Sequence, residues 1–211
     1  MMNDRFYAAA LAGIIWLAAA TSSMAQPAAD PPLDLDNLLA VVRQREAGIA
    51  QWQGYAATLT VSDGVQTETM QLYARRKPNL MLRVSYADGR AGIYDSRDPQ
   101  HMRGKSRLGG WHYLPLKNRW SGTHTINEAD LLHLVDTLLA IAQKYQAARL
   151  PVQRHGAAWR VTNAAEQWDV DVTFNPFPTK LVVYSHGQLR QSVEYRDLRI
   201  NPTLPDSLFR W

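Results

Sequence analysis

Two aspartates one residue apart are the side chains in this sequence whose spacing best suits acid–base chemistry. Asp169 and Asp171 alternate with the apolar residues of 168–172, so both carboxylates face the same side of a predicted strand. Paired carboxylates can act as general acid and general base. The same alternation is typical of a polar strand surface opposite a buried one, and we favour this second interpretation.

The other residue types that carry catalysis or hold metals form no recognisable motif. The chain has six histidines, none spaced as a pair of metal ligands on a helix, and no cysteine, which excludes thiol nucleophiles and disulfides. No Gly-x-Ser-x-Gly elbow or phosphate-binding loop occurs, and Gly109-Gly110 is predicted to be a turn. The acidic stretch 95–99 lacks the length and spacing of a calcium loop. We therefore expect no catalytic residue, no metal, no cofactor and no enzyme activity.

The first 25 residues have the pattern of a secretory signal peptide. Arg5 precedes an uncharged run over 6–20, and small residues precede a cleavage point after Ala25. The run is shorter than the ~20 residues that span a bilayer as a helix, although an uncleaved membrane anchor is the open alternative. We predict export to the periplasm, a flexible lead-in over 26–33, and a single folded domain over 34–211.

Positive charge is concentrated in one stretch of the sequence. Residues 75–107 contain nine basic and three acidic residues, whereas the whole chain has 23 and 19. Tyrosines lie among them, and a basic, aromatic surface can bind single-stranded nucleic acid. An exported protein meets anionic lipid headgroups or acidic protein surfaces instead, so we expect no nucleic acid and predict Arg83, Arg90 and Arg103 as partner or headgroup contacts. A solvated outer face of a sheet is the open alternative.

The elements that must position these residues are two helices and many short strands. Apolar residues recur at helical spacing over 34–53, and again over 131–142 after the capping residues of 125–128. Elsewhere the period is two, with turn signals such as Ser62-Asp63-Gly64 and Asp88-Gly89. About ten strands joined by short turns make an antiparallel sheet that is curved or closed to protect its edges. The sequence thus predicts a mainly β (α+β) domain.

Three short motifs occur in an order that is similar to a known family. Arg76-Lys77-Pro78-Asn79-Leu80 stands between two predicted strands, a helix leads into the strand ending at Ser62-Asp63-Gly64, and 193–209 contains a last strand with an Asn-Pro…Asp…Phe ending. Together they resemble the LolA-like superfamily of periplasmic outer-membrane lipoprotein carriers. Residues 113–128 and the long helix after them look closer to an uncharacterised branch of that superfamily than to LolA proper.

The resemblance implies a strongly curved antiparallel sheet, an unclosed β-barrel, with two helices lidding its concave face. It implies a soluble periplasmic monomer that holds lipid or lipoprotein acyl chains in an apolar cavity, with a transport or chaperone role. Lys77 is expected to link the sheet to the lid, although lysine lacks the planar fork of arginine. The alternative is a non-enzymatic interaction or sensor module that contacts an envelope membrane protein through the basic face at 75–107.

Larger apolar side chains on one strand face are the candidates for lining such a cavity. Each methylene moved out of water contributes about 0.8 kcal/mol, so even one buried chain gives useful affinity. The alternative for each residue is that it packs against the helices as core. The candidates are Leu59, Val61, Met70, Leu72, Leu82, Val84, Trp111, Tyr113, Trp168, Val170 and Val172.

Overall fold

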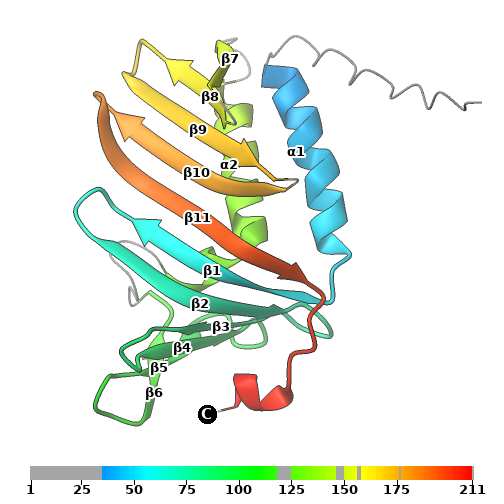
Figure 1. Ribbon diagram of the computed structural model, residues 1–211, viewed down its shortest axis with the longest axis vertical. Coiled ribbons are helices and arrows are strands. Elements are labelled where there is room, and N and C mark those ends of the chain that lie inside the picture. The colour runs from blue at the N-terminus through cyan, green and yellow to red at the C-terminus, as the bar shows by residue number, and fades with distance from the viewer. Residues whose placement is uncertain (1–34, 118–124, 146–149, 156–157, 176, 211) are drawn as a thin grey trace, which may run out of the picture. The chain divides into compact units, whose positions relative to one another are not determined.

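The structure is a computed structural model that describes residues 35–117, 125–145, 150–155, 158–175 and 177–210 (Figure 1). The predicted signal peptide (1–25) and lead-in (26–33) lie outside the described residues. No helix in the described part of the chain has the length and apolar character needed to cross a membrane.

Eleven strands in the described residues form one antiparallel sheet, in the spatial order β6-β5-β4-β3-β2-β1-β11-β10-β9-β8-β7. The sheet is open, because β6 and β7 stand at its two ends and do not pair with each other. The predicted mainly β fold, an unclosed barrel with two helices, is confirmed. The strands are β1 (Gly54–Ser62), β2 (Thr67–Arg75), β3 (Met81–Ser85), β4 (Ala91–Asp95), β5 (His101–Lys105), β6 (Trp111–Pro115), β7 (Val152–His155), β8 (Ala158–Asn163), β9 (Trp168–Phe174), β10 (Pro178–Ser185) and β11 (Gln188–Ile200).

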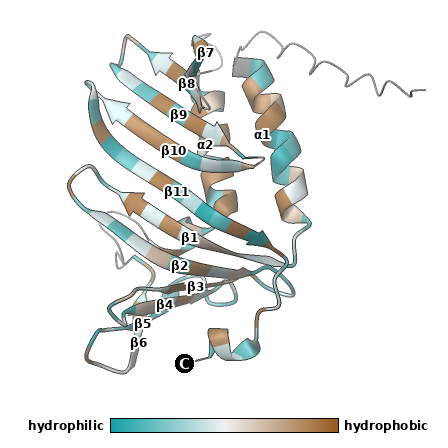
Figure 2. Cartoon of the chain, viewed as in Figure 1, coloured by the Kyte–Doolittle hydropathy of each residue, from teal (hydrophilic) through white to brown (hydrophobic). Residues whose placement is uncertain are grey.

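The two long helices cover one face of this sheet, which we call the inner face (Figure 1). Helix α1 (Leu35–Ala50) buries Leu38, Val42 and Ile49, and α2 (Leu131–Tyr145) buries the side chains of one apolar stripe. Figure 2 shows these apolar stripes and the alternation along the strands. Burying each large apolar side chain contributes about 1.5–3 kcal/mol, so packing against the sheet stabilises the helices more than their own propensity does.

The second predicted helix begins differently from what its capping pattern indicates. Residues Ile126–Ala129 form a short 3-10 helix, η1, in which the backbone N–H of Thr125 donates to the Glu128 carboxylate at 3.0 Å. Asp130 is then extended, and α2 starts at Leu131, with the N–H of His133 donating to the carbonyl of Asp130 at 2.9 Å. The break places the Asp130 carboxylate between η1 and α2 rather than inside a helix.

The opposite, outer face of the sheet is covered in one region by the C-terminal residues. Another 3-10 helix, η3 (Asp206–Phe209), packs against β3 and buries Phe209. The guanidinium of Arg75 lies 4.7 Å from the centre of the Phe209 ring, and Arg83 Nη1 donates to the carbonyl of Leu208 at 2.6 Å. Arginines on the outer face therefore hold the C-terminal helix in place.

Candidate functional site

A buried ion pair ties the start of α2 to the sheet. Arg76 Nη2 donates to both carboxylate oxygens of Asp130 at 2.7 Å, and the two side chains are only 11% and 7% exposed. The Tyr55 hydroxyl donates to Asp130 Oδ1 at 2.8 Å and accepts the backbone N–H of Leu131 at 2.7 Å. Burial raises the pKa of Tyr55 well above its ordinary value, and the neighbouring Asp130 charge adds to this. We call this set of groups the lid anchor.

The prediction that Lys77 links the sheet to the lid is wrong, because Arg76 makes this contact and Lys77 is exposed. The backbone N–H of Arg76 bonds to Gln53 at 2.8 Å and so extends the pairing of β2 with β1 by one residue. Side chains alternate along a strand, so Arg76 points to the inner face, as Ala74 does two residues earlier. Arg76, one residue before Lys77, thus supplies the planar guanidinium group that lysine lacks.

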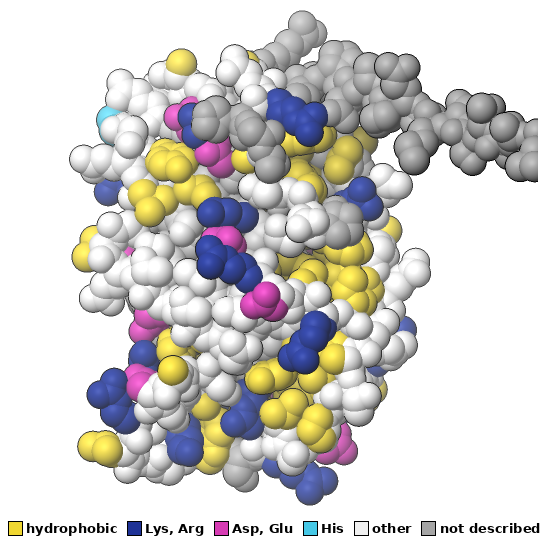
Figure 3. Space-filling model, viewed as in Figure 1, with side chains coloured by type: hydrophobic (Ala, Val, Ile, Leu, Met, Phe, Trp, Pro, Cys, Tyr) yellow, Lys and Arg dark blue, Asp and Glu magenta, His cyan; other side chains and the backbone are white. Residues whose placement is uncertain are grey.

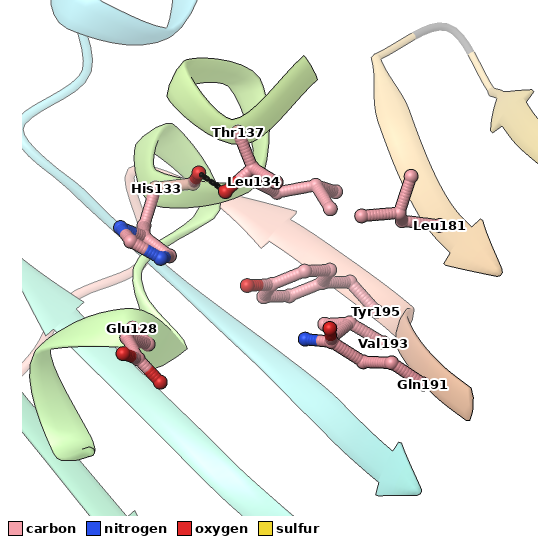
Figure 4. A pocket seen from close by; sticks show the side chains of 8 residues that line it. All are labelled: Glu128, His133, Leu134, Thr137, Leu181, Gln191, Val193 and Tyr195. Atoms are coloured by element: carbon pink, nitrogen blue, oxygen red, sulfur yellow. Dashed lines mark hydrogen bonds between the residues drawn. The ribbon is translucent and has the colours of Figure 1, made fainter. Parts of the chain in front are cut away.

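A pocket of about 300 Å³ lies between the lid and the sheet (Figure 4). Its floor is apolar: Leu134 of α2 and Leu181 of β10 point toward one another, and Tyr195 and Val193 of β11 lie beside them. Its rim is polar and carries Glu128, His133, Thr137 and Gln191. The Thr137 hydroxyl donates to the carbonyl of His133 at 2.8 Å, so one rim group is already bonded within α2. We call this space the lid pocket.

Most of the predicted lining residues form the core beneath the lid. On the inner face, buried against the helices, lie Leu59, Val61, Met70, Leu72, Leu82, Val84, Val170 and Val172. Trp168 shares that face but is half-buried, and its Nε1 donates to Glu166 at 2.9 Å. The lid pocket is lined instead by residues of β10, β11, η1 and α2. The period-two alternation of 180–186 and 189–200 is the sequence signal that places Leu181, Val193 and Tyr195 on the inner face.

The prediction that Trp111 and Tyr113 line an inner cavity is wrong, because both lie on the outer face. Tyr113 pairs with Arg103 across β5 and β6, and Leu114 occupies the inner side next to it. Tyr113 is 53% exposed, its ring stacks on that of His101 at 4.5 Å, and the Arg103 guanidinium lies 5.1 Å from it. The residues of β6 on the inner face are His112 and Leu114, which pair with Gly104 and Met102.

The arginines predicted to contact a partner are engaged within the protein. Arg83 holds Leu208 and donates to Ser85 Oγ at 3.1 Å, and Arg90 bonds to Glu68 at 3.0 Å and Asp88 at 2.9 Å. Other arginines of 75–107 also form ion pairs within the protein: Arg75–Asp206, Arg97–Asp95 and Arg107–Asp88. On the face in view in Figure 3, basic side chains lie scattered among acidic ones and form no continuous patch.

The two aspartates with acid–base spacing share one face of β9, as the alternation predicts, and this is the outer face. Arg160 of β8 donates from Nε and Nη2 to the two oxygens of Asp171 at 2.6 and 2.7 Å, and this bond raises the pKa of Arg160. A carboxylate held by both oxygens is a poor general base. Among the described residues, no group of three or more acidic or histidine side chains is placed to hold a metal ion.

The fold is therefore an open antiparallel sheet with two helices across its inner face and a pocket beneath one of them. Among solved structures, a chain of the MucA/MucB complex from Pseudomonas aeruginosa matches it with a TM-score of 0.50 and 11% identity, over 82% of this chain and 60% of that one. This chain thus spans about 60% of the length of that neighbour.

Two further solved structures match the chain with lower TM-scores. A putative outer membrane lipoprotein-sorting protein domain from Vibrio parahaemolyticus matches with 12% identity over 81% of this chain and 95% of its own, with a TM-score of 0.40. A LolA superfamily protein from Nitrosomonas europaea matches with 12% identity over 82% and 96%, with a TM-score of 0.36. No family model and no curated protein matches the chain. At this identity the likeness concerns the fold alone.

Proposed function

We propose that this chain is a periplasmic, non-enzymatic lipid- or lipoprotein-binding protein that holds an acyl chain in the lid pocket. The observation that carries the proposal is the pocket itself, with its apolar floor and polar rim between α2 and the sheet. Its volume of about 300 Å³ is at the lower end of the range for ligand sites, which suits part of one chain. The signal-peptide pattern supports the location, and the resemblance of the sequence motifs to the LolA-like superfamily supports the class of ligand.

Binding of a longer chain requires the lid to move away from the sheet. Leu134, Leu181 and Val193 are core residues, so a chain that enters between them exchanges one apolar contact for another at little cost. The lid anchor keeps the first turn of α2 in place while the remaining turns shift. Eight methylenes moved from water contribute about 6 kcal/mol before the cost of moving the helix is subtracted.

The proposal is tested by filling the lid pocket from its rim. Thr137→Trp places an indole over the apolar floor, whereas Ala140→Trp puts the same group on the exposed side of α2. Native mass spectrometry of periplasmic preparations is expected to show co-purified lipid on the wild type and on Ala140→Trp, and at least tenfold less on Thr137→Trp. If the wild type carries no lipid and takes up no fluorescent diacyl lipopeptide, the proposal fails.

A second candidate function is that of an envelope interaction module. It is supported by the fold shared with MucB, which has been solved in complex with MucA. In this case the native mass spectrum would show the bare chain and a complex of defined stoichiometry with an envelope protein. Thr137→Trp would then leave that complex unchanged.

A further inference from the structure

Three arginines line a pocket on the outer face of the sheet, beside the short helix η3 near the C-terminus (Figure 1). Arg75 precedes the inward-pointing Arg76, so its side chain lies on the outer face with those of Met81 and Asp95, the residues opposite it in register across β3 and β4. The pocket measures about 390 Å³. We call it the arginine pocket, and its lining residues are Arg75, Arg97, Asp206, Phe209 and Arg210.

Two of these arginines are held in place by carboxylates of the protein itself. Arg97 donates from Nε and Nη2 to the carboxylate of Asp95, and Nη1 of Arg75 donates to Asp206. The Nη2 of Arg75 lies 2.8 Å from Sδ of Met81, which is a weak acceptor. Its Nε is buried without a hydrogen-bond partner among the described residues. The contacts of the described residues therefore satisfy the Arg75 guanidinium only in part.

The other donors of the arginine pocket are available to a ligand. Within the part of the chain that the structure describes, Nη1 of Arg97 and the whole guanidinium of Arg210 have no hydrogen-bond or ion-pair partner, and both side chains are exposed. The backbone N–H of Arg210 donates to the carbonyl of Ser207, so the end of η3 holds this residue at the pocket. Three arginines are thus matched by two carboxylates, those of Asp95 and Asp206, which leaves one positive charge in excess.

We propose that the arginine pocket binds a phosphate monoester, carried either by a soluble molecule or by a lipid headgroup. Such a group has nearly two negative charges at neutral pH and three acceptor oxygens, so it can accept from Arg97 Nη1 and from the fork of Arg210 at the same time. A carboxylate has only two oxygens, and one guanidinium satisfies both, as Arg97 does for Asp95. This site shares no lining residue with the lid pocket and does not depend on the function proposed for it.

The Asp206 carboxylate opposes binding of an anion in this pocket. It is bonded to Arg75 in the pocket wall, and its side chain is 68% exposed. A phosphate held by Arg97 and Arg210 shares the pocket with this carboxylate and is repelled by it, whereas the contact of Arg75 with the Phe209 ring stays intact. Asp206→Asn is therefore expected to tighten phosphate binding about threefold to fivefold, a gain that a loss of folding cannot produce.

The test is a calorimetric titration of the full chain with inorganic phosphate and with glycerol phosphate, at low ionic strength, where charges are least screened. Arg97→Ala and Arg210→Ala are each expected to weaken binding at least about tenfold, because each removes charge-assisted hydrogen bonds. Arg43→Ala, which removes an exposed cation of α1, and Asp136→Asn, which removes an exposed acid of α2, are the matched controls and are expected to stay within about twofold of the wild type.

Co-sedimentation with phosphatidylcholine vesicles, with and without phosphatidic acid, shows which molecule carries the phosphate. Binding only to vesicles that contain phosphatidic acid, lost in Arg210→Ala and kept in Thr137→Trp, supports the proposal with a lipid headgroup as ligand. Binding of the soluble phosphates without the vesicles, and with the expected effect of each variant, supports it with a soluble ester. The proposal is overturned if the wild type binds none of these probes, or if folded Arg97→Ala, Arg210→Ala and Asp206→Asn all bind them as the wild type does.

Discussion

Replacing Arg76 by methionine removes the cation of the lid anchor while keeping a side chain of similar length. The Asp130 carboxylate would then stay buried with the Tyr55 hydroxyl as its remaining side-chain donor among the described contacts. Removing one partner of a buried ion pair costs about 3–5 kcal/mol. The Nε of Arg76 is itself buried without a hydrogen-bond partner among the described residues, and methionine removes this unpaired group. We therefore expect a loss near the lower limit, about 3 kcal/mol in the free energy of unfolding.

The assay is urea denaturation followed by tryptophan fluorescence, combined with a double-mutant cycle. Asp130→Asn alone is expected to cost about 2–3 kcal/mol, and the double variant about as much as the more damaging single one, since the two changes remove the same interaction. Lys77→Met is the matched control, because it removes a neighbouring but exposed cation and is expected to stay within about 0.5 kcal/mol. Hydrogen exchange in Arg76→Met is expected to rise first at the start of α2.

The reasoning is refuted if Arg76→Met is as stable as Lys77→Met, or if the two single losses simply add in the double variant. Either result would mean that the ion pair seen between β2 and α2 does not hold the lid.

Three further results are expected. Burial raises the pKa of both Tyr55 and Tyr195, so the unfolded state loses these two protons at a lower pH than the folded state does. Their contribution to the free energy of unfolding is therefore fully present below about pH 10 and falls above it by up to about 2.7 kcal/mol per pH unit. In alkaline denaturation curves, Tyr55→Phe is expected to roughly halve this slope. Phe209→Ala, which empties the contact of η3 with the outer face, is expected to cost about 3 kcal/mol in urea denaturation, whereas Asp206→Asn at the exposed end of that helix costs less than about 1. Asp171→Asn is expected to lower the urea midpoint, because it leaves Arg160 without its carboxylate partner. The double variant Arg160→Gln and Asp171→Asn is expected to restore the midpoint, which would show that the aspartate serves an ion pair and not a reaction.

The strand and helix positions were predictable because they depend on local patterns. Alternation over 55–61 and 180–186 and the helical spacing over 131–142 are properties of neighbouring residues, and the structure has elements at each of these ranges. The lid contact was assigned one residue away from its true position because a motif centred on Pro78 does not state which side chain points inward. That choice is made by the register of β2 against β1, which extends through Arg76.

The lid pocket could not be predicted because it depends on contacts between distant residues. It lies where Leu134 of α2 approaches Leu181 and Tyr195. The position of Trp111 on the outer face follows from which residues of β6 pair with Met102 and Gly104. Large aromatic side chains are not by themselves a sign of the buried face of a strand.

The basic stretch at 75–107 acquires a different meaning once its partners are known. Arg76 holds the lid, Arg75 and Arg83 hold η3, and Arg90 and Arg107 converge on Asp88, where hydrogen bonds from Arg107 and from the backbone of Arg90 lower the pKa of that carboxyl. An arginine that satisfies a buried or half-buried acceptor is costly to withdraw for a partner. Most of these cations therefore stabilise contacts within the protein. A partner that bound through Arg75 or Arg83 would have to break the contacts that position the C-terminal helix. Only binding through Arg76 would be coupled to movement of the lid, because Arg76 alone among these arginines contacts Asp130.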